Sequence, residues 1–569
     1  AVTPSGDTYT INNAKQLAWI ADQVNTGVTS FAGKTIKLNA NIDLSGKIWS
    51  AIGYDANVHF DGTFDFNGHS ITNMITSGTY VKDTSVTGVK CVGANFVGLF
   101  GYTVNATIKS TGAKGIVGSD VDNSKVISLG AAGGVVGFAQ NTQISNVENY
   151  ASITSTSSSD NSTSSDNSTE KKGSAGIVGT IYSVQGTIEL DDLVNHGKVS
   201  VSQDYVGGIV GVVYGNTRTS VNITKSRNVG NISGKNRVGG IVGGIDNSSS
   251  TFPSLSINGV DNWINDTAEN ISTTPDNTGT ISGTNYVGGI VGENIGGTIE
   301  GVTNTGTISG STSVGGIVGR ITNNARVYEA VNTGTITGTS DSIGGIAGYV
   351  FFVDRTDSTT LMNLLNKSEQ ITSQNSSAQI GKIVGSFYNN SKAKEQVFMA
   401  VDTSTSTNLF GNSGVTKNES VVSLSSIEGL IDSNTNITYD GTKYETYLSV
   451  FNDSLVWRYI DGSNTDANWS GVGSSTNKNN IKLAYNNKPR GEEPGRDING
   501  NYNVYSQNNL IYLSDLNTKR FGVSSASGKA VIASNITLTN VKPLGFGAYP
   551  WKIDVDGRKI DADGRARQV

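Results

Sequence analysis

The sequence is poor in cysteine, proline and charge, and these shortages exclude several kinds of protein. Its 569 residues include seven prolines and one cysteine, Cys91, and charged side chains make up only 15% of the chain. One cysteine cannot form an intrachain disulfide or a cysteine-ligated metal site. We therefore interpret Cys91 as a small buried apolar side chain.

Basic clusters and long apolar runs are also missing. The 41 Lys and Arg residues are scattered, and the formal net charge is −6, whereas nucleic acids and anionic membranes attract clustered cations. No run approaches the ~20 apolar residues that span a bilayer, and no cationic apolar leader opens the chain. The sequence therefore predicts no nucleic-acid partner and no direct membrane insertion.

Glycine, in contrast, is abundant and regularly placed. Many of the 71 glycines close a recurring phrase, apolar-Gly-Gly-Ile-Val-Gly, and the closing glycines are 27 to 49 residues apart. A period of this length is typical of a repeat protein that stacks one small unit. The closing glycines are Gly101, Gly137, Gly179, Gly211, Gly243, Gly292, Gly319, Gly348 and Gly385.

An asparagine in a turn is the second landmark of the repeat. It precedes the next closing glycine by 15 or 16 residues in the regular units, as in Asn195 and Asn304. The residues of the shortest unit indicate three short strands with alternating apolar side chains, separated by glycine and asparagine corners. Three strands per coil, stacked coil on coil, make a parallel β-solenoid. The asparagines are Asn149, Asn195, Asn228, Asn277, Asn304, Asn332 and Asn366.

Equivalent side chains of successive coils are expected to stack. We predict an internal ladder of Ile209, Ile241, Ile290 and Ile317. We also predict a corner ladder of the asparagines, in which each side-chain amide bonds the backbone or its neighbour in the next coil; a binding role for this row is the alternative. Two polar insertions, 155–172 and 246–276, are expected to be surface loops.

The two ends of the chain resemble each other. Residues 12–25 have the apolar spacing of a helix behind an asparagine cap, which predicts a helix that shields the open end of the solenoid. The last part of the chain repeats this beginning, segment by segment. The repeating segments are 502–504 for 9–11, 535–538 for 41–44, and 554–560 for 65–71.

These patterns divide the chain into four parts. Residues 1–90 form an N-terminal cap and first strands, 91–390 the coils, 391–490 a closing region, and 491–569 a partial second module that resembles the cap. The second module stops where its first coil is expected. Either the sequence is a fragment of a longer array, or another copy completes the half-module and stacks head to tail on its open strand edge.

The sequence Phe-Asp-Gly-Thr-Phe-Asp-Phe-Asn-Gly-His-Ser-Ile at 60–71, Gly-Leu-Phe-Gly at 98–101 and the Gly-Gly-Ile-Val-Gly series resemble the GLUG-motif proteins of bacterial surfaces, including repeat regions of IgA-peptidase-like and adhesin-like proteins. The resemblance covers roughly residues 8 to 480. It implies an exported, cell-surface or secreted protein and supplies no catalytic residues. The expected fold is all-β, a right-handed parallel β-helix of about nine or ten coils with an N-terminal helix-bearing cap and a less regular C-terminal region.

Side chains suited to catalysis are sparse. The three histidines, His59, His69 and His196, have no Ser, Cys or carboxylate at triad spacing, and no His-Glu-x-x-His pair occurs. The strands between 200 and 350 carry almost no Asp or Glu, whereas β-helix enzymes that degrade polysaccharides need clustered carboxylates or a calcium site. We therefore expect no catalytic residue, no cofactor and no enzymatic activity.

One group of carboxylates resembles a calcium loop. It consists of Asp554, Asp556, Asp561 and Asp563, which lie beside glycines. Their spacing departs from that of an EF-hand, and they align with a non-acidic corner of the first module. A tight turn without metal is the interpretation we favour.

Glycosylation is a further hypothesis, although a chain rich in Asn, Ser and Thr contains many acceptor sequences by chance. The candidate acceptors are Asn105, Asn161, Asn167, Asn231, Asn265, Asn366, Asn418, Asn452 and Asn468.

Together these observations predict a non-enzymatic extracellular structural protein: a surface stalk, an adhesin segment or a fibre subunit whose partners are copies of itself or adjacent modules. A carbohydrate-binding module is the alternative, with Trp457 or Trp469 stacking on host or environmental glycans. A polysaccharide-degrading β-helix enzyme is the third interpretation.

Overall fold

The structure is a computed structural model. It describes residues 1–388 except 78–95, 129, 156–170, 217–218, 247–252, 259–278, 354–358, 367 and 369, together with short strands and single residues of the remaining chain. The chain divides into two compact units. Unit 1 comprises Ala1–Asn262 and Ser272–Gly429, and unit 2 comprises Trp263–Ile271 and Leu430–Val569.

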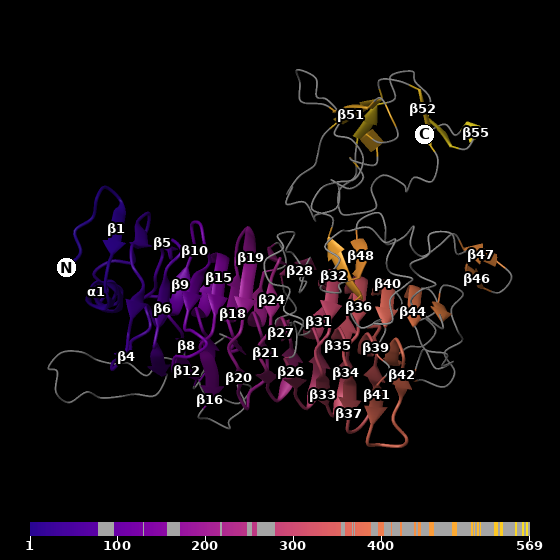
Figure 1. The fold of residues 1–569 in the computed structure, drawn as a ribbon, viewed down its shortest axis with the longest axis horizontal. Helices are drawn as coiled ribbons and strands as arrows, with labels where there is room; N and C mark the ends of the chain where they lie inside the picture. The colour runs from indigo at the N-terminus through magenta and orange to yellow at the C-terminus, as the bar shows by residue number, and fades with distance from the viewer. Residues whose placement is uncertain are drawn as a thin grey trace. The chain divides into compact units, whose positions relative to one another are not determined.

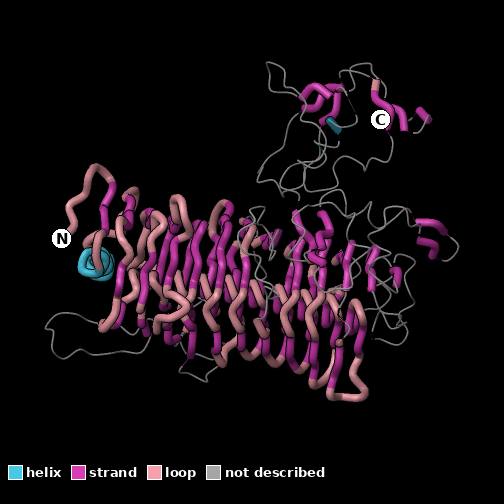
Figure 2. The backbone as a smooth tube through the Cα atoms, in the orientation of Figure 1, coloured by secondary structure: helices cyan, strands magenta, loops and turns pink. Residues whose placement is uncertain are grey.

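Unit 1 is a stack of parallel strands (Figure 1). Over the residues described, the strands form one 17-stranded, one 10-stranded and two 9-stranded sheets. We call them sheets A, B, D and C, in the order in which the chain visits them within one coil. Figure 2 shows the strands alternating with short loops in each coil.

Sheets A and B hold the strands on either side of the asparagine corner. Sheet A contains β1 (Thr8–Ile11), β2 (Thr35–Leu38), β3 (Ile42–Asp43), β5 (Thr63–Asp65), β6 (Ser70–Thr72), β10 (Thr107–Lys109), β11 (Gly115–Val117), β15 (Gln143–Asn149), β19 (Thr187–Asn195), β23 (Ser220–Thr224), β24 (Arg227–Asn228), β28 (Ser254–Asn258), β32 (Thr298–Asn304), β36 (Arg326–Asn332), β40 (Thr360–Asn366), β44 (Val397–Asp402) and β45 (Val421–Ser423). Sheet B contains β4 (Ile48–Trp49), β7 (Ile75–Ser77), β12 (Lys125–Ser128), β16 (Ser152–Ser155), β20 (Val199–Ser200), β25 (Ile232–Ser233), β29 (Ile281–Ser282), β33 (Ile308–Gly310), β37 (Ile336–Gly338) and β41 (Ile371–Ser373).

The other two sheets meet at the glycine-rich phrase. Sheet D contains β8 (Phe96–Val97), β13 (Ala131–Gly133), β17 (Ser174–Ala175), β21 (Val206–Gly207), β26 (Asn236–Gly239), β30 (Asn285–Gly288), β34 (Thr312–Gly315), β38 (Ile343–Gly344) and β42 (Ile380–Gly381). Sheet C contains β9 (Phe100–Val104), β14 (Val136–Gln140), β18 (Val178–Ser183), β22 (Val210–Gly215), β27 (Val242–Ile245), β31 (Val291–Ile295), β35 (Val318–Thr322), β39 (Ala347–Phe351) and β43 (Val384–Tyr388).

A single core runs through unit 1, because every second side chain of a strand points inward. In the coil from β32 to β35 the inward side chains are fully buried. They stack on their equivalents in the next coil, as Ile308 faces Ile336 and Val318 faces Ala347. The all-β parallel solenoid predicted from the repeat is confirmed, with nine or ten strands in sheets B, C and D.

The prediction of three strands per coil is wrong, because the recurring phrase bends between sheets D and C. In the shortest coil β34 ends at Gly315 and β35 begins at Val318. A Cβ atom on Gly316 would lie 2.2 Å from the carbonyl oxygen of Gly345 and 2.4 Å from Cγ of Asn332. Only glycine allows the bend to approach the neighbouring coil this closely.

Both predicted ladders are confirmed. The isoleucines are at most 3% exposed, and the amide of Ile241 donates to the carbonyl of Ile290 at 2.9 Å. In the corner, Nδ2 of Asn195 donates to Oδ1 of Asn228 at 2.8 Å and to the carbonyl of Gly197 at 2.9 Å. The same links join Asn149 to Asn195, Asn304 to Asn332, and Asn332 to Asn366. Asn277 lies outside the residues described.

The predicted helix is confirmed as α1 (Ala14–Asn25), at the N-terminal end of the stack in Figure 1. Oδ1 of Asn13 accepts the amide hydrogen of Gln16 at 3.1 Å and caps the helix. The apolar face of the helix is buried in the core, and the helix takes the place of the strands that follow sheet A in later coils. Its buried residues are Leu17, Ile20, Ala21 and Val24.

The expectation that 246–276 is a surface loop is wrong in part. β28 lies within it and pairs with β23 and β32, and Leu255 and Ile257 are fully buried. The alternating segment Ser-Leu-Ser-Ile is short and comes directly after Pro253. The composition of the insertion therefore gave no indication of a strand. Most of the insertion 155–172 lies outside the residues described.

Unit 2 contains strands that repeat the pairings with which unit 1 begins. β50 (Tyr502–Val504), β51 (Lys529–Ile532) and β53 (Lys552–Asp554) pair in parallel like β1, β2 and β5. β52 (Ile536–Leu538) pairs with β54 (Ile560–Ala562) as β3 pairs with β6. The equivalent pairs are Val504–Ile532 and Ile11–Leu38, Val531–Asp554 and Lys37–Asp65, and Ile536–Ile560 and Ile42–Ile71.

Unit 2 also contains antiparallel pairs. β46 (Ile437–Tyr439) pairs with β47 (Thr442–Tyr444), β48 (Leu455–Tyr459) with β49 (Ile481–Tyr485), and β54 with β55 (Arg565–Ala566). In unit 1, sheet A continues past residue 390 through β44 and β45. The four-part division of the chain stays a prediction.

Candidate functional site

The corner at which each sheet D strand begins holds one residue per coil in an unusual backbone conformation. Five successive coils place a non-glycine residue at φ between 55° and 61° just before the phrase. L-residues rarely adopt this left-handed region, so the shared corner imposes it. The residues are Tyr205, Arg237, Tyr286, Ser313 and Ser342.

Aromatic rings and guanidinium groups alternate along this side of the solenoid. Cζ of Arg237 lies 4.9 Å from the ring centroid of Tyr205 and 5.6 Å from that of Tyr286. Cζ of Arg320 lies 5.3 Å from the Tyr286 ring and 5.4 Å from the Phe351 ring. These distances are typical of cation–π contacts.

The Phe351 ring stacks in turn on Tyr388, with centroids 4.9 Å apart and planes 19° apart. Six successive coils thus contribute one side chain each to a continuous row. We call Tyr205, Arg237, Tyr286, Arg320, Phe351 and Tyr388 the Tyr–Arg stack.

A buried carboxylate holds the two arginines. Oε2 of Glu293 accepts from Nε of Arg237, and Oε1 accepts from Nη1 of Arg320, both at 2.6 Å. Asp204 accepts from Nη1 of Arg237 at 3.2 Å. A buried charge needs such partners to offset its lost hydration. The expectation that these strands carry almost no carboxylate overlooked Glu293, which lies on β31.

Two ionisable groups of the stack, Arg237 and Tyr205, are held in fixed protonation states. Burial works against the charge of Arg237, but Glu293, Tyr205 and Asp204 outweigh it and raise the pKa of the guanidinium. Burial, reinforced by Asp246 and Glu293, raises the pKa of the Tyr205 phenol. Neither group exchanges a proton near neutral pH, so this arrangement suits binding and not acid–base catalysis.

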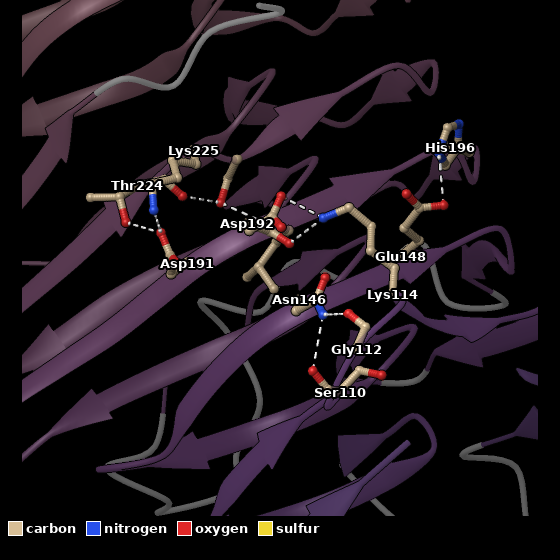
Figure 3. A network of polar contacts seen from close by, with 12 residues as sticks. Ser110, Gly112, Lys114, Asn146, Glu148, Asp191, Asp192, His196, Thr224 and Lys225 are labelled. Atoms are coloured by element: carbon tan, nitrogen blue, oxygen red, sulfur yellow. Dashed lines mark hydrogen bonds and ion pairs between the residues drawn. The ribbon is translucent and has the colours of Figure 1, made fainter. Parts of the chain in front are cut away.

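A second polar cluster lies on sheet A (Figure 3). Nε2 of His196 lies 3.6 Å from Oε2 of Glu148, to which the Tyr150 hydroxyl donates at 3.2 Å. The rings of Tyr150 and His196 stack with centroids 4.2 Å apart. Both aromatic residues come directly after a ladder asparagine, and this explains why they meet across one coil. We call Glu148, Tyr150 and His196 the Glu148 cluster.

Ion pairs near the Glu148 cluster join side chains of different coils. Lys114 pairs with the carboxylate of Asp192 and donates to its backbone carbonyl at 3.0 Å, while Lys225 lies 3.5 Å from Asp191 (Figure 3). Exposed pairs of this kind contribute little to stability individually. Here they join side chains that are more than 30 residues apart in the sequence.

The protonation states of the Glu148 cluster also argue against catalysis. Burial alone would raise the pKa of Glu148, but His196, Lys114 and Tyr150 outweigh it and lower that pKa. Burial and the Glu148 charge raise the pKa of Tyr150. A carboxylate held ionised and a phenol held protonated are poor as general acid and general base.

The three histidines lie outside the strands. Nδ1 of His59 is 2.9 Å from the carbonyl oxygen of Ala56, and Nδ1 of His69 is 3.3 Å from Oδ1 of Asn41. His196 does face a carboxylate, Glu148. The sequence did not reveal this contact, because an insertion separates the two residues.

The structure covers the calcium candidates only in part. Asp554 ends β53 and Asp561 lies in β54, whereas Asp556 and Asp563 are outside the residues described. No three His, Cys, Asp or Glu side chains converge in the portion of the chain that the structure covers. Calcium binding therefore stays a prediction without a test.

The unit 1 equivalent of Asp554 is Asp65, and it stabilises a turn. Its carboxylate accepts from the amides of Asn67 at 2.8 Å and Thr111 at 2.9 Å, and from the Thr111 hydroxyl at 2.8 Å. Burial would raise the pKa of Asp65, but these hydrogen bonds lower it. This precedent favours the tight-turn interpretation of the second module.

The glycosylation candidates differ in exposure. Asn105 and Asn231 are exposed, whereas Asn366 is fully buried in the asparagine ladder. A buried amide cannot carry a glycan in the folded chain, so Asn366 is withdrawn as a candidate. Asn161, Asn167, Asn265, Asn418, Asn452 and Asn468 lie outside the residues described, as do Cys91 and Trp469. Trp457 lies on β48.

Comparison with known families supports the repeat assignment. Residues 283–309 match the family model of the GLUG motif. This segment contains one complete phrase, from Val287 to Gly292, and the ladder residue Asn304. The resemblance to GLUG-motif repeat proteins is therefore confirmed.

Comparison with individual proteins adds little. A crystal structure from Bacteroides ovatus, whose assignment as an immunoglobulin A1 protease is itself provisional, is 14% identical, covers 69% of this chain and 87% of its own, and has a TM-score of 0.31. A TM-score this low carries no argument for fold or function. No curated protein matches the chain. Among the helices described, none has the length and apolar character needed to cross a membrane.

Proposed function

We propose that this chain is a non-enzymatic structural protein of the bacterial exterior: a stalk, adhesin segment or fibre subunit in which the solenoid acts as a stiff spacer. The observation that carries the proposal is the register of the two buried ladders. The isoleucine column stays in register across the 246–276 insertion. The described parts of the asparagine column link Asn149 through Asn195 to Asn228, and Asn304 through Asn332 to Asn366. Continuous hydrogen bonding between coils resists bending and shear.

The chemistry of the two polar clusters supports a passive role. Arg237 of the Tyr–Arg stack and Glu148 of the Glu148 cluster are held charged by their raised and lowered pKa values, and Tyr205 and Tyr150 are held protonated by their raised pKa values. Each cluster joins consecutive coils and contributes to the stiffness of the spacer. The GLUG motif supports an exported location, because this motif is typical of bacterial surface and secreted proteins.

Axial stacking is the finer part of the proposal. Unit 2 repeats the strand pairings of the first coils of unit 1, and in unit 1 the strands β5 and β6 are continued by β10 and β11. We propose that the outer edge of β53 is continued in the same way by a strand of a second copy. A contact of this head-to-tail kind builds filaments and not closed rings.

Negative-stain electron microscopy tests this proposal. Full-length protein is compared with a chain that ends at Pro489 and therefore lacks the repeated strands of unit 2. Filaments with a regular axial repeat for the full chain, and single rods for the shorter one, support the fibre. Isolated rods in both samples rule out stacking through unit 2 and leave the stalk. Particles without a rod contradict the spacer itself.

A further inference from the structure

We propose that the exposed end of the Tyr–Arg stack binds a linear acidic polysaccharide. The site consists of Arg320, Tyr349, Phe351 and Tyr388, on the outer face of sheet C. This function goes beyond the structural role, and neither proposal depends on the other.

The last ring of the stack is open to a ligand. Tyr388 has one ring face against Phe351, yet 56% of the residue is exposed, so the opposite ring face meets solvent. Phe351 and Tyr349 are partly exposed beside it. Large rings with a polar end are efficient contact residues, because they offer apolar area at a low cost in conformational entropy.

Of the two charged groups on the strands of this site, the guanidinium is the exposed one. Within β27, β31, β35, β39 and β43 the charged residues are Glu293 and Arg320. The Glu293 side chain is only 2% exposed and both of its oxygens accept from arginines, whereas Arg320 is 23% exposed. A ligand can therefore reach the guanidinium of Arg320 but not the carboxylate of Glu293. A ligand carboxylate complements this charge.

The spacing of the site suits a polymer that lies along the solenoid axis. Arg320, Phe351 and Tyr388 come from successive coils, and neighbouring strands lie about 4.8 Å apart. An extended chain of sugars along the axis passes the edge of a ring or a guanidinium at each coil, with one C–H face on the free ring face of Tyr388 and a carboxylate at Arg320.

The site is already formed without a ligand. Arg320 is fixed between the Tyr286 and Phe351 rings and by its ion pair with Glu293, and Phe351 is fixed by its strand. Binding therefore costs little ordering of side chains, which favours affinity. We place the glycan contacts here and not at Trp457 and Trp469.

The test measures binding of polygalacturonate to the full-length chain by isothermal titration calorimetry. Dextran serves as the neutral polysaccharide and poly-glutamate as the acidic peptide. We expect polygalacturonate to bind, with affinity that falls as salt rises, and neither control polymer to match it. Tyr388→Ala and Arg320→Gln should each weaken binding by about tenfold or more.

A matched variant separates the site from general electrostatics. Lys225→Gln removes one positive charge from sheet A, where Lys225 is 52% exposed beside Asp191, and should leave binding unchanged. Thermal unfolding of each variant checks that the fold is intact; Tyr388→Ala removes a mostly exposed side chain and preserves it.

Three outcomes overturn the inference: no binding of polygalacturonate beyond that of dextran, equal or tighter binding of poly-glutamate, or full binding by folded Tyr388→Ala and Arg320→Gln. Each of these leaves the filament experiment unaffected, so failure of the glycan site is distinguishable from failure of the structural role.

Discussion

At the scale of single residues, the buried asparagines explain how polar groups occupy the interior of an apolar solenoid. Asn195 donates to the carbonyl of Gly197 and to Oδ1 of Asn228, and it accepts from Nδ2 of Asn149. Asn149, Asn304 and Asn332 likewise donate to a carbonyl of their own turn and to one neighbour. A polar group can be buried at this position because its hydrogen bonds are complete.

Asn195→Ala tests this role. The substitution removes the side-chain donor to the Gly197 carbonyl and the acceptor of one of the two hydrogen bonds that Nδ2 of Asn149 donates, in a fully buried corner. We expect the free energy of unfolding to fall by about 2–3 kcal/mol, measured by denaturant titration. Asn222→Ala, which removes an exposed hydrogen bond to Glu189, is the control and should change stability by less than about 0.5 kcal/mol. Equal effects contradict the ladder as a source of stability.

Glu148 links the stability of the chain to pH. Its pKa in the folded chain is below the ordinary value of 4.5, so its ionised form stabilises the fold above that pH. This contribution is lost as the pH falls through the folded pKa. Wild type should therefore be more stable than Glu148→Gln near neutral pH, and the difference should shrink in acid, as measured by denaturant titration at each pH. A difference in the free energy of unfolding that stays constant with pH contradicts this explanation.

At the scale of the element, glycine decides where a coil bends. Gly316 in the bend faces both a carbonyl and the asparagine ladder at distances shorter than any Cβ contact, whereas a Cβ on Gly244 would have its nearest neighbour, the Glu293 carbonyl oxygen, at 3.3 Å. Gly316 lies between β34 and β35, whereas Gly244 lies within β27, and the two glycines differ in the space around them.

The pair Gly316→Ala and Gly244→Ala separates bend geometry from general loss of glycine. We expect Gly316→Ala to lower the free energy of unfolding by about 3 kcal/mol, because backbone must move apart. Gly244→Ala should cost less than about 1 kcal/mol. Thermal unfolding compares the two, and similar shifts in Tm argue against a close-packed bend.

The period of the repeat was enough to predict the solenoid and its two ladders, but not where each strand ends and the chain bends. The constant interval between Asn304 and Gly319 indicated the ladders and the solenoid, because equivalent positions in a stack must coincide. The bend was missed because Gly315, Gly316 and Ile317 read as a continuation of the strand. Alternation alone does not show where a strand turns.

The Tyr–Arg stack was missed for a different reason. Arg237 and Glu293 are 56 residues apart, because the segment between them contains the 246–276 insertion, so no local pattern joins them. One signal could have found it: the residue before each phrase is Tyr205, Arg237 and Tyr286 in three successive units. Residues that vary at a fixed position of a repeat face outward, where binding evolves without disturbing the core.

At the scale of the whole molecule, the pairing scheme of the first strands of unit 1 recurs within unit 2. In unit 1 these first strands lead into nine or ten strands in each of sheets B, C and D, and insertions leave the coils in register. A rod built in this way holds groups on its surface at fixed spacing. We therefore expect a protein that spaces and holds its ligand and does not transform it.

The measurement that tests this central claim most directly is turnover of the proposed ligand. Polygalacturonate and a panel of neutral polysaccharides are incubated with full-length protein, and new reducing ends and unsaturated uronates are quantified over time. We predict binding of polygalacturonate without release of fragments above the protein-free blank. Depolymerisation that Glu148→Gln or Glu293→Gln abolishes, in variants that remain folded, would contradict this claim and make the solenoid an enzyme.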